Sequence, residues 1–70
     1  MKIAFTVHTQ FRLKKRKIQK GEVIDAVKYP DAILKRHGKY FFRKKLRRGT
    51  IEVCCERTER HIKVITVYWI

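Results

Sequence analysis

Four side chains near the start of the chain have the types and the spacing needed to bind and transform a phosphate. In the stretch HTQFRLKKRK, His8 is followed by Arg12, Lys15 and Arg16, and residues three, four, seven or eight positions apart are neighbours on a helix. An imidazole can take up a proton near neutral pH. Guanidinium groups bind phosphate through paired hydrogen bonds and stabilise the charge that develops during reaction. A solvated basic helix would show the same spacing, so periodicity leaves both interpretations open.

The overall charge indicates an anionic partner. The chain of 70 residues carries 19 Lys and Arg against 6 Asp and Glu, a net charge of +13, and such self-repulsion is costly unless an anion offsets it. The cations are concentrated in residues 11–20 and 41–50. The charge is compatible with nucleic acid, an acidic protein or an anionic membrane surface as the partner. Of these we expect RNA, single-stranded or associated with the ribosome, with an acidic protein as an alternative. The predicted nucleic-acid-binding residues are Lys14, Lys15, Lys17, Lys39, Arg43, Lys45, Arg47 and Arg48.

Aromatic residues interleave with these cations in the stretch KYFFRKK, residues 39–45. Such a pattern can stack exposed bases while the cations hold the phosphate backbone of a single strand. The same aromatic residues could equally fill the core, which a small domain needs, and we expect this of at least one or two of them.

Neither a metal nor an organic cofactor is predicted. The histidines and cysteines lack the CxxC or HxxxH spacing of a zinc site, the acidic residues are scattered, and the three glycines stand apart from one another. Cys54 and Cys55 are adjacent. On a strand they would point to opposite faces, so we expect two reduced thiols.

The chain is expected to be cytoplasmic and to have no membrane association. Its longest mostly apolar run, VITVYWI at 64–70, is too short to cross a bilayer. No signal peptide precedes the first apolar segment.

The first part of the chain predicts one strand followed by two short helices. KIAFTV, residues 2–7, alternates as a half-buried strand does. Thr9 is the expected cap of a helix that reaches Lys15 or Arg16, with Phe11 facing inward. A second helix begins near residue 21, places Val23, Ile24 and Val27 on one stripe, and stops before Pro30.

The rest of the chain predicts four strands joined by short turns. These are AILKR, KYFFRKKL, TIEVCCE and HIKVITVYW, and strands with such short connections must be antiparallel. The second and third form a hairpin through Arg48 and Gly49. In KYFFRKKL, Phe41, Arg43 and Lys45 should line a largely cationic face opposite Phe42. The final strand, apolar on both faces, should be central.

Strict alternation in that final strand predicts two sets of side chains. Ile62, Val64, Thr66 and Tyr68 form one set, and Lys63, Ile65, Val67 and Trp69 form the other. The hydroxyl groups of Thr66 and Tyr68 should therefore project on the same side.

Several short motifs together resemble a known family. They are His8 and Arg12 at the first helix, Arg16 followed by Ile18, Glu22 with Val23, Pro30, Gly38, and the strand VITVYW at 64–69. This set is similar to a family of small prokaryotic domains related to the RelE and BrnT toxins of type II toxin–antitoxin systems. Our sequence has Lys17 where relatives often have glycine, and Gln19 where a serine or threonine often caps the second helix.

The resemblance implies a single α+β domain over residues 1–70 with the order β-α-α-β-β-β-β. Two short helices would pack on an antiparallel sheet in a RelE/barnase-like toxin fold. It also implies a metal-independent endoribonuclease neutralised by an acidic antitoxin. The implied catalytic residues are His8, Arg12, Arg16, Thr66 and Tyr68. The alternative is a nucleic-acid-binding module without catalysis, because likeness of fold does not establish activity.

Overall fold

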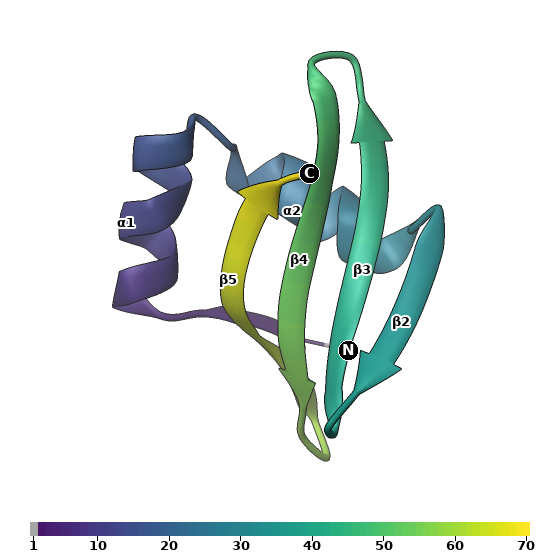
Figure 1. Ribbon diagram of the computed structural model, residues 1–70. Coiled ribbons are helices and arrows are strands. Elements are labelled where there is room, and N and C mark those ends of the chain that lie inside the picture. The colour runs from purple at the N-terminus through teal and green to yellow at the C-terminus, as the bar shows by residue number, and fades with distance from the viewer. Residues whose placement is uncertain (1) are drawn as a thin grey trace.

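The computed structural model describes residues 2–70 as one mixed sheet with two helices (Figure 1). The predicted α+β class, with two helices and five strands in a single small unit, is confirmed. Helix α2 packs on one face of the sheet, whereas α1 lies along the edge of β5 and leaves the other face open. The elements are β1 (Lys2–Phe5), α1 (Val7–Arg16), α2 (Lys20–Lys28), β2 (Ala32–Arg36), β3 (Lys39–Leu46), β4 (Gly49–Arg57) and β5 (His61–Trp69).

The sheet has the strand order β1-β5-β4-β3-β2. The four later strands are antiparallel, as their short turns predict, and β5 lies between β1 and β4. The expectation of an entirely antiparallel sheet is wrong at one pair, because β1 runs parallel to β5, with Lys2 beside His61 and Phe5 beside Val64. Since the rest of the domain connects β1 to β5, the chain has ample length for a parallel return.

The core lies between α2 and the sheet. Val23 and Ala26 of α2 are fully buried, and the sheet contributes Ile51, Val53 and Val67, also with no exposed surface. The other buried core side chains are Leu13, Ile18, Phe42, Cys55 and Val64. Phe42 is therefore a core residue, as expected of part of the aromatic run.

Helix α1 begins earlier than the sequence predicts. Its N-cap is Thr6, whose hydroxyl accepts a hydrogen bond from the backbone N–H of Thr9 at 3.0 Å, so the prediction that Thr9 is the cap is wrong. Thr9 and Leu13, one helical turn apart, face the sheet and are buried. The prediction that Phe11 faces inward is also wrong, because this side chain is 71% exposed on the outer side of the helix.

A β-bulge at Ile65 changes the faces of β5. Cys54 pairs with Thr66 whereas Cys55 pairs with Val64, so Ile65 has no partner in the register with β4. The alternation predicted for this strand is therefore wrong across the bulge, because Val64 and Val67 both point into the core. Thr66 and Tyr68, both beyond the bulge, do lie on the same side, which is the open face.

Side chains of α1 take the place of a neighbouring strand along the outer edge of β5. Strand β1 ends at Phe5. Beyond it the Thr9 hydroxyl donates to the carbonyl oxygens of Val64 at 2.8 Å and of Ile65 at 2.9 Å. The Arg16 guanidinium donates to the carbonyl oxygen of Val67 at 2.7 Å. These bonds satisfy backbone acceptors that a strand would otherwise pair, and they fix α1 against the sheet.

We predict that Thr9→Val destabilises the domain by about 1–3 kcal/mol, because it removes the donor for two carbonyls in a buried setting. The free energy of unfolding, measured by denaturant titration, checks this. Thr9→Ser is the matched control because it keeps the hydroxyl, and we expect it to lose distinctly less. Equal losses in the two variants would contradict the role of these hydrogen bonds.

Candidate nucleic-acid interface

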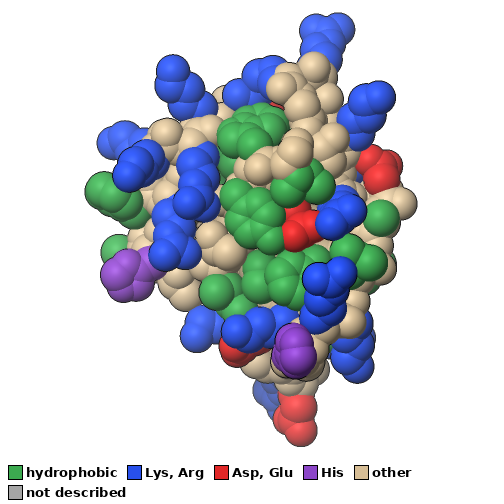
Figure 2. Space-filling model, in the orientation of Figure 1, with side chains coloured by type: hydrophobic (Ala, Val, Ile, Leu, Met, Phe, Trp, Pro, Cys, Tyr) green, Lys and Arg blue, Asp and Glu red, His purple; other side chains and the backbone are tan. Residues whose placement is uncertain are grey.

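The open face of the sheet carries aligned rows of side chains. At its lower end in Figure 1 the cross-strand partners are Lys63, Glu56 and Lys39. Near its upper end the corresponding row is Tyr68, Glu52 and Arg43. The two rows are four residues apart along β4, about 13 Å at the usual rise of a strand. Figure 2 shows hydrophobic side chains over the middle of this face, with acidic and basic groups among them and Lys and Arg side chains over α1 beside them.

One hollow of about 320 Å³ brings together the start of α1 and the lower row of the sheet. Its lining includes His8 and Arg12 from α1 together with Lys39 and Lys63 from β3 and β5. Thr6, Glu56 and Ile65 complete it. Three predicted residues, His8, Arg12 and Lys39, thus meet in one place although Lys39 lies far from the other two in the sequence.

Arg16 and Thr66 are also brought together. The Arg16 guanidinium lies 3.4 Å from the Thr66 hydroxyl while it donates to the Val67 carbonyl. Both side chains lie between the lower and upper rows, because Thr66 pairs with Cys54 in the row between them. The stripe of His8, Arg12 and Arg16 on α1 therefore runs beside the open face.

The fifth predicted catalytic residue, Tyr68, lies in a separate hollow of about 140 Å³. Its hydroxyl donates a hydrogen bond to Glu52, whose other carboxylate oxygen accepts from Arg43 Nε at 2.5 Å. Leu34 and Phe41 supply the apolar part of the lining, and Arg36 supplies a second guanidinium. Glu52 is only 7% exposed. Its negative charge is therefore compensated by Arg43 and the Tyr68 hydroxyl more than by solvent.

These contacts determine the protonation states in the hollow. Burial would raise the pKa of Glu52, but hydrogen bonds from Tyr68 and Arg43 outweigh it and hold the pKa below its ordinary value. The hydrogen bond to Glu52, with burial, raises the pKa of Tyr68 to about 12. Tyr68 is therefore a hydrogen-bond donor at neutral pH and a poor base.

The remaining predicted cations are distributed over several surfaces. Arg43 and Lys45 share the open side of β3 by alternation, whereas Arg48 points to the helix side. There Arg48 binds both carboxylate oxygens of Glu22, at 2.7 and 2.8 Å, and the carbonyl of Lys17 at 2.9 Å. Arg48 thus joins the two helices to the hairpin. The other predicted nucleic-acid-binding cations are exposed and line neither hollow: Lys14, Lys15, Lys17, Lys45 and Arg47.

Sequence reasoning missed Lys63, Glu52 and Glu56 as parts of this surface. An isolated carboxylate in the apolar strand TIEVCCE was the available signal for Glu52, since a buried charge requires partners. Lys63 lies near His8 because β1 pairs in parallel with β5 and because β5 has a bulge. No local sequence pattern indicates either feature.

The two cysteines lie on opposite faces, as alternation predicts. Cys54 belongs to the open face and Cys55 to the core, and both are buried free thiols. Burial raises the pKa of both, that of Cys55 to about 12, which makes them weak nucleophiles.

Among residues 2–70, no three His, Cys, Asp or Glu side chains gather where they could hold a metal ion. Within the same range, neither helix has the length and apolar character required to cross a bilayer.

These features define the class of the protein. It is a small α+β domain with one open sheet face and a basic helix beside that face. The chain belongs to the family described as a domain of unknown function, DUF4258, whose model matches residues 5–69. No curated protein and no solved structure matches the chain significantly.

We predict that Tyr68 titrates near pH 12 and that Glu52→Gln moves its pKa back toward the ordinary value of 10.0. A pKa raised in the folded state contributes stability below the unfolded pKa, and that stability is lost as pH rises through about 12. Ultraviolet absorbance of tyrosinate measures the titration, and Tyr68→Phe identifies which transition belongs to this residue. A transition with the same midpoint in wild type and Glu52→Gln would contradict the hydrogen bond.

Proposed function

We propose that this domain binds single-stranded RNA on the open face of its sheet and cleaves it without a metal. The observation that carries the proposal is the hollow where His8 and Arg12 of α1 meet Lys39 and Lys63 of the sheet. It combines one imidazole, a side chain able to act as a general base, with three fixed cations around a space of phosphate size or larger.

The proposed reaction is attack by a ribose 2′-hydroxyl on the adjacent phosphorus. His8 takes the proton of the hydroxyl, the new P–O bond forms, and the bond to the 5′-oxygen breaks. The leaving oxygen takes a proton from water, and His8 returns its proton to solvent. Arg12, Lys39 and Lys63 stabilise the extra negative charge at phosphorus, which is the electrostatic contribution that a cation makes in such reactions. The products are a 2′,3′-cyclic phosphate and a 5′-hydroxyl.

Of the two candidate bases, His8 and Tyr68, the geometry favours His8. Tyr68 donates its proton to Glu52 and has a raised pKa, so it suits binding better than proton abstraction. Its ring and that of Phe41 border one hollow with Arg36 and Arg43, and together they could stack a base and hold its phosphate. Arg16 and Thr66 lie between this hollow and His8, where they would contact the intervening backbone.

Likeness to the RelE- and BrnT-related toxins supports the same proposal. On that interpretation, the substrate is RNA, free or on the ribosome, and an acidic antitoxin would offset the net charge of +13. The domain would then be the toxin of a pair.

A nucleic-acid-binding module without catalysis is the second candidate. The observation that favours it is the hydrogen-bonded set of Tyr68, Glu52 and Arg43, which commits the most buried polar groups of the face to one another. Of the two candidate bases, Tyr68 is thereby removed, and the upper hollow can contribute base stacking and phosphate contacts but no proton transfer.

We predict that the wild-type protein cleaves mixed RNA in the presence of a chelator and that His8→Ala reduces the rate by about 10²–10⁴-fold. Gel analysis gives the rate, and mass spectrometry identifies cyclic phosphate ends. His37→Asn is the control, because His37 is exposed in the β2–β3 turn and asparagine tolerates its positive φ of 52°. Intact RNA, or equal rates in wild type and His8→Ala, would overturn the catalytic proposal and leave the binding module.

We predict that RNA affinity falls steeply with salt and that Arg12→Gln with Lys63→Gln reduces the slope. Each lost phosphate contact should lower the slope of log K against log salt by about 0.7. The control pair Lys28→Gln with Arg60→Gln removes the same charge from exposed positions that do not line the hollow. Fluorescence anisotropy at several salt concentrations measures both. Equal slopes for the two double variants would show diffuse attraction only, which contradicts a defined phosphate site.

A further inference from the structure

Strand β2 is an edge strand with one side unpaired. It bonds to β3 from Ala32 beside Arg43 to Arg36 beside Lys39, and among residues 2–70 no strand lies on its other side. The outward N–H and C=O groups of such a strand are a template for another extended chain. At the opposite side of the sheet, side chains of α1 bond to the backbone carbonyls of β5 that no strand pairs. No helix lies along β2 in the same way (Figure 1).

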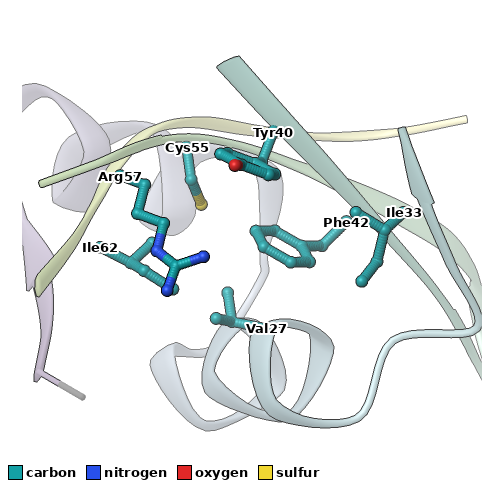
Figure 3. Close-up of a pocket in the computed structure, with 7 residues that line it drawn as sticks. All are labelled: Val27, Ile33, Tyr40, Phe42, Cys55, Arg57 and Ile62. Atoms are coloured by element: carbon teal, nitrogen blue, oxygen red, sulfur yellow. The ribbon is translucent and has the colours of Figure 1, made fainter. Parts of the chain in front are cut away.

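An apolar cavity lies directly beside this edge. It measures about 230 Å³ and extends between α2 and the sheet, from Ile33 on β2 to Ile62 on β5. Figure 3 shows Ile33 at one end and the Arg57 guanidinium extending over the space from β4. Ile33 is 55% exposed, so the edge presents apolar surface next to the cavity.

The charged side chains of β2 indicate which kind of extended chain could pair with its free edge. The register places Ile33 beside Phe42 and Lys35 beside Tyr40, both toward the helix side, whereas Arg36 points to the open face. The Lys35 ammonium lies 5.4 Å above the Tyr40 ring. The ion pairs of the described residues are Arg43 with Glu52 and Arg48 with Glu22, so Lys35 and Arg36 have no carboxylate partner.

A second copy of the same chain suits this edge poorly. Each copy brings a net charge of +13, and bringing two such surfaces together is opposed by their repulsion. Lysine and arginine on an edge strand commonly prevent pairing between copies. The same two cations attract a strand that carries carboxylates.

We propose that the free edge of β2 binds an extended acidic segment of a partner protein, which adds as a sixth strand. A large apolar residue opposite Ile33 would enter the cavity, and carboxylates opposite Lys35 and Arg36 would pair with them. In antiparallel addition the segment reads acidic, acidic, any residue, then large apolar. Backbone hydrogen bonds supply affinity in this mode, and the pocket with its flanking charges supplies specificity.

This surface lies across the sheet from His8 and Arg12, but it shares Arg36 with the upper hollow of the proposed RNA surface. His8 and Arg12 lie on α1, at the β5 side of the molecule, whereas β2 forms the other edge of the sheet. Binding to β2 can therefore be measured without RNA, and the loss of cleavage in His8→Ala does not affect it.

The test uses the acetylated and amidated peptide Thr-Glu-Glu-Thr-Leu-Thr-Val and the full chain labelled with ¹⁵N. We expect saturable shifts of the amide signals of residues 32–36, with smaller changes on α1. A second peptide, Thr-Glu-Glu-Leu-Thr-Thr-Val, has the same composition but turns leucine to the other face. It should bind at least about tenfold more weakly, which is a difference of about 1.4 kcal/mol.

Variants of the protein separate register from charge. Lys35→Glu with Arg36→Glu should weaken the first peptide by at least about tenfold, whereas Lys14→Glu with Lys15→Glu makes the same charge change on α1 and should weaken it distinctly less. Ile33→Thr keeps the edge cations and β propensity but removes the apolar contact, and should lose the preference between peptides. Thermal melts confirm folding of each variant. No binding of the first peptide, equal binding of both peptides, or equal losses in the two charge variants would overturn the proposal.

Discussion

The hydrogen bonds between α1 and the outer edge of β5 determine where the candidate site can exist. Strand β1 covers only the first part of that edge, and Thr9 and Arg16 bond the carbonyls beyond it. Because Thr9 docks at the bulge of Ile65, the helix is fixed in rotation as well as in position. His8 and Arg12 are consequently held on the side of α1 nearest the open face, where they meet Lys39 and Lys63. Without this attachment the same residues would be an exposed basic helix, which is the alternative that the spacing left open.

The two ends of the open face differ in how their charges are compensated. At its lower end, cations from three elements outnumber the single carboxylate of Glu56 in the hollow, so an anion would improve the local balance of charge. At its upper end, Glu52 is compensated by Arg43 and by the Tyr68 hydroxyl. The first arrangement is suited to a phosphate and the second to a flat ring beside one. A single strand that crosses the face would meet both.

Local sequence patterns predicted the helices and strands, but they did not predict all of the contacts between these elements. Turn residues and alternation predicted the hairpin through Arg48 and the antiparallel order of the later strands, because those features depend on neighbours in sequence. The parallel pairing of β1 and the bulge at Ile65 depend on long-range contacts. They therefore had no signal in a window of ten residues. The same limit explains why His8 and Arg12 were identified but Lys63 was not. Lys17 has a φ of 56°, in the left-handed region, which gives a backbone reason for the glycine expected there.

The pairing of β1 with β5 has a consequence for biosynthesis. The hollow around His8 needs residues near both ends of the described chain, since α1 is bonded to the carbonyls of residues 64–67 and accepts a hydrogen bond from the Trp69 indole at the carbonyl of Arg16. During translation the early helix must wait, unattached, until β5 has left the ribosome, because domains with such long-range pairing complete their structure late. Were this domain a ribonuclease, a nascent chain still lacking β5 would have no assembled centre with which to damage the message that encodes it.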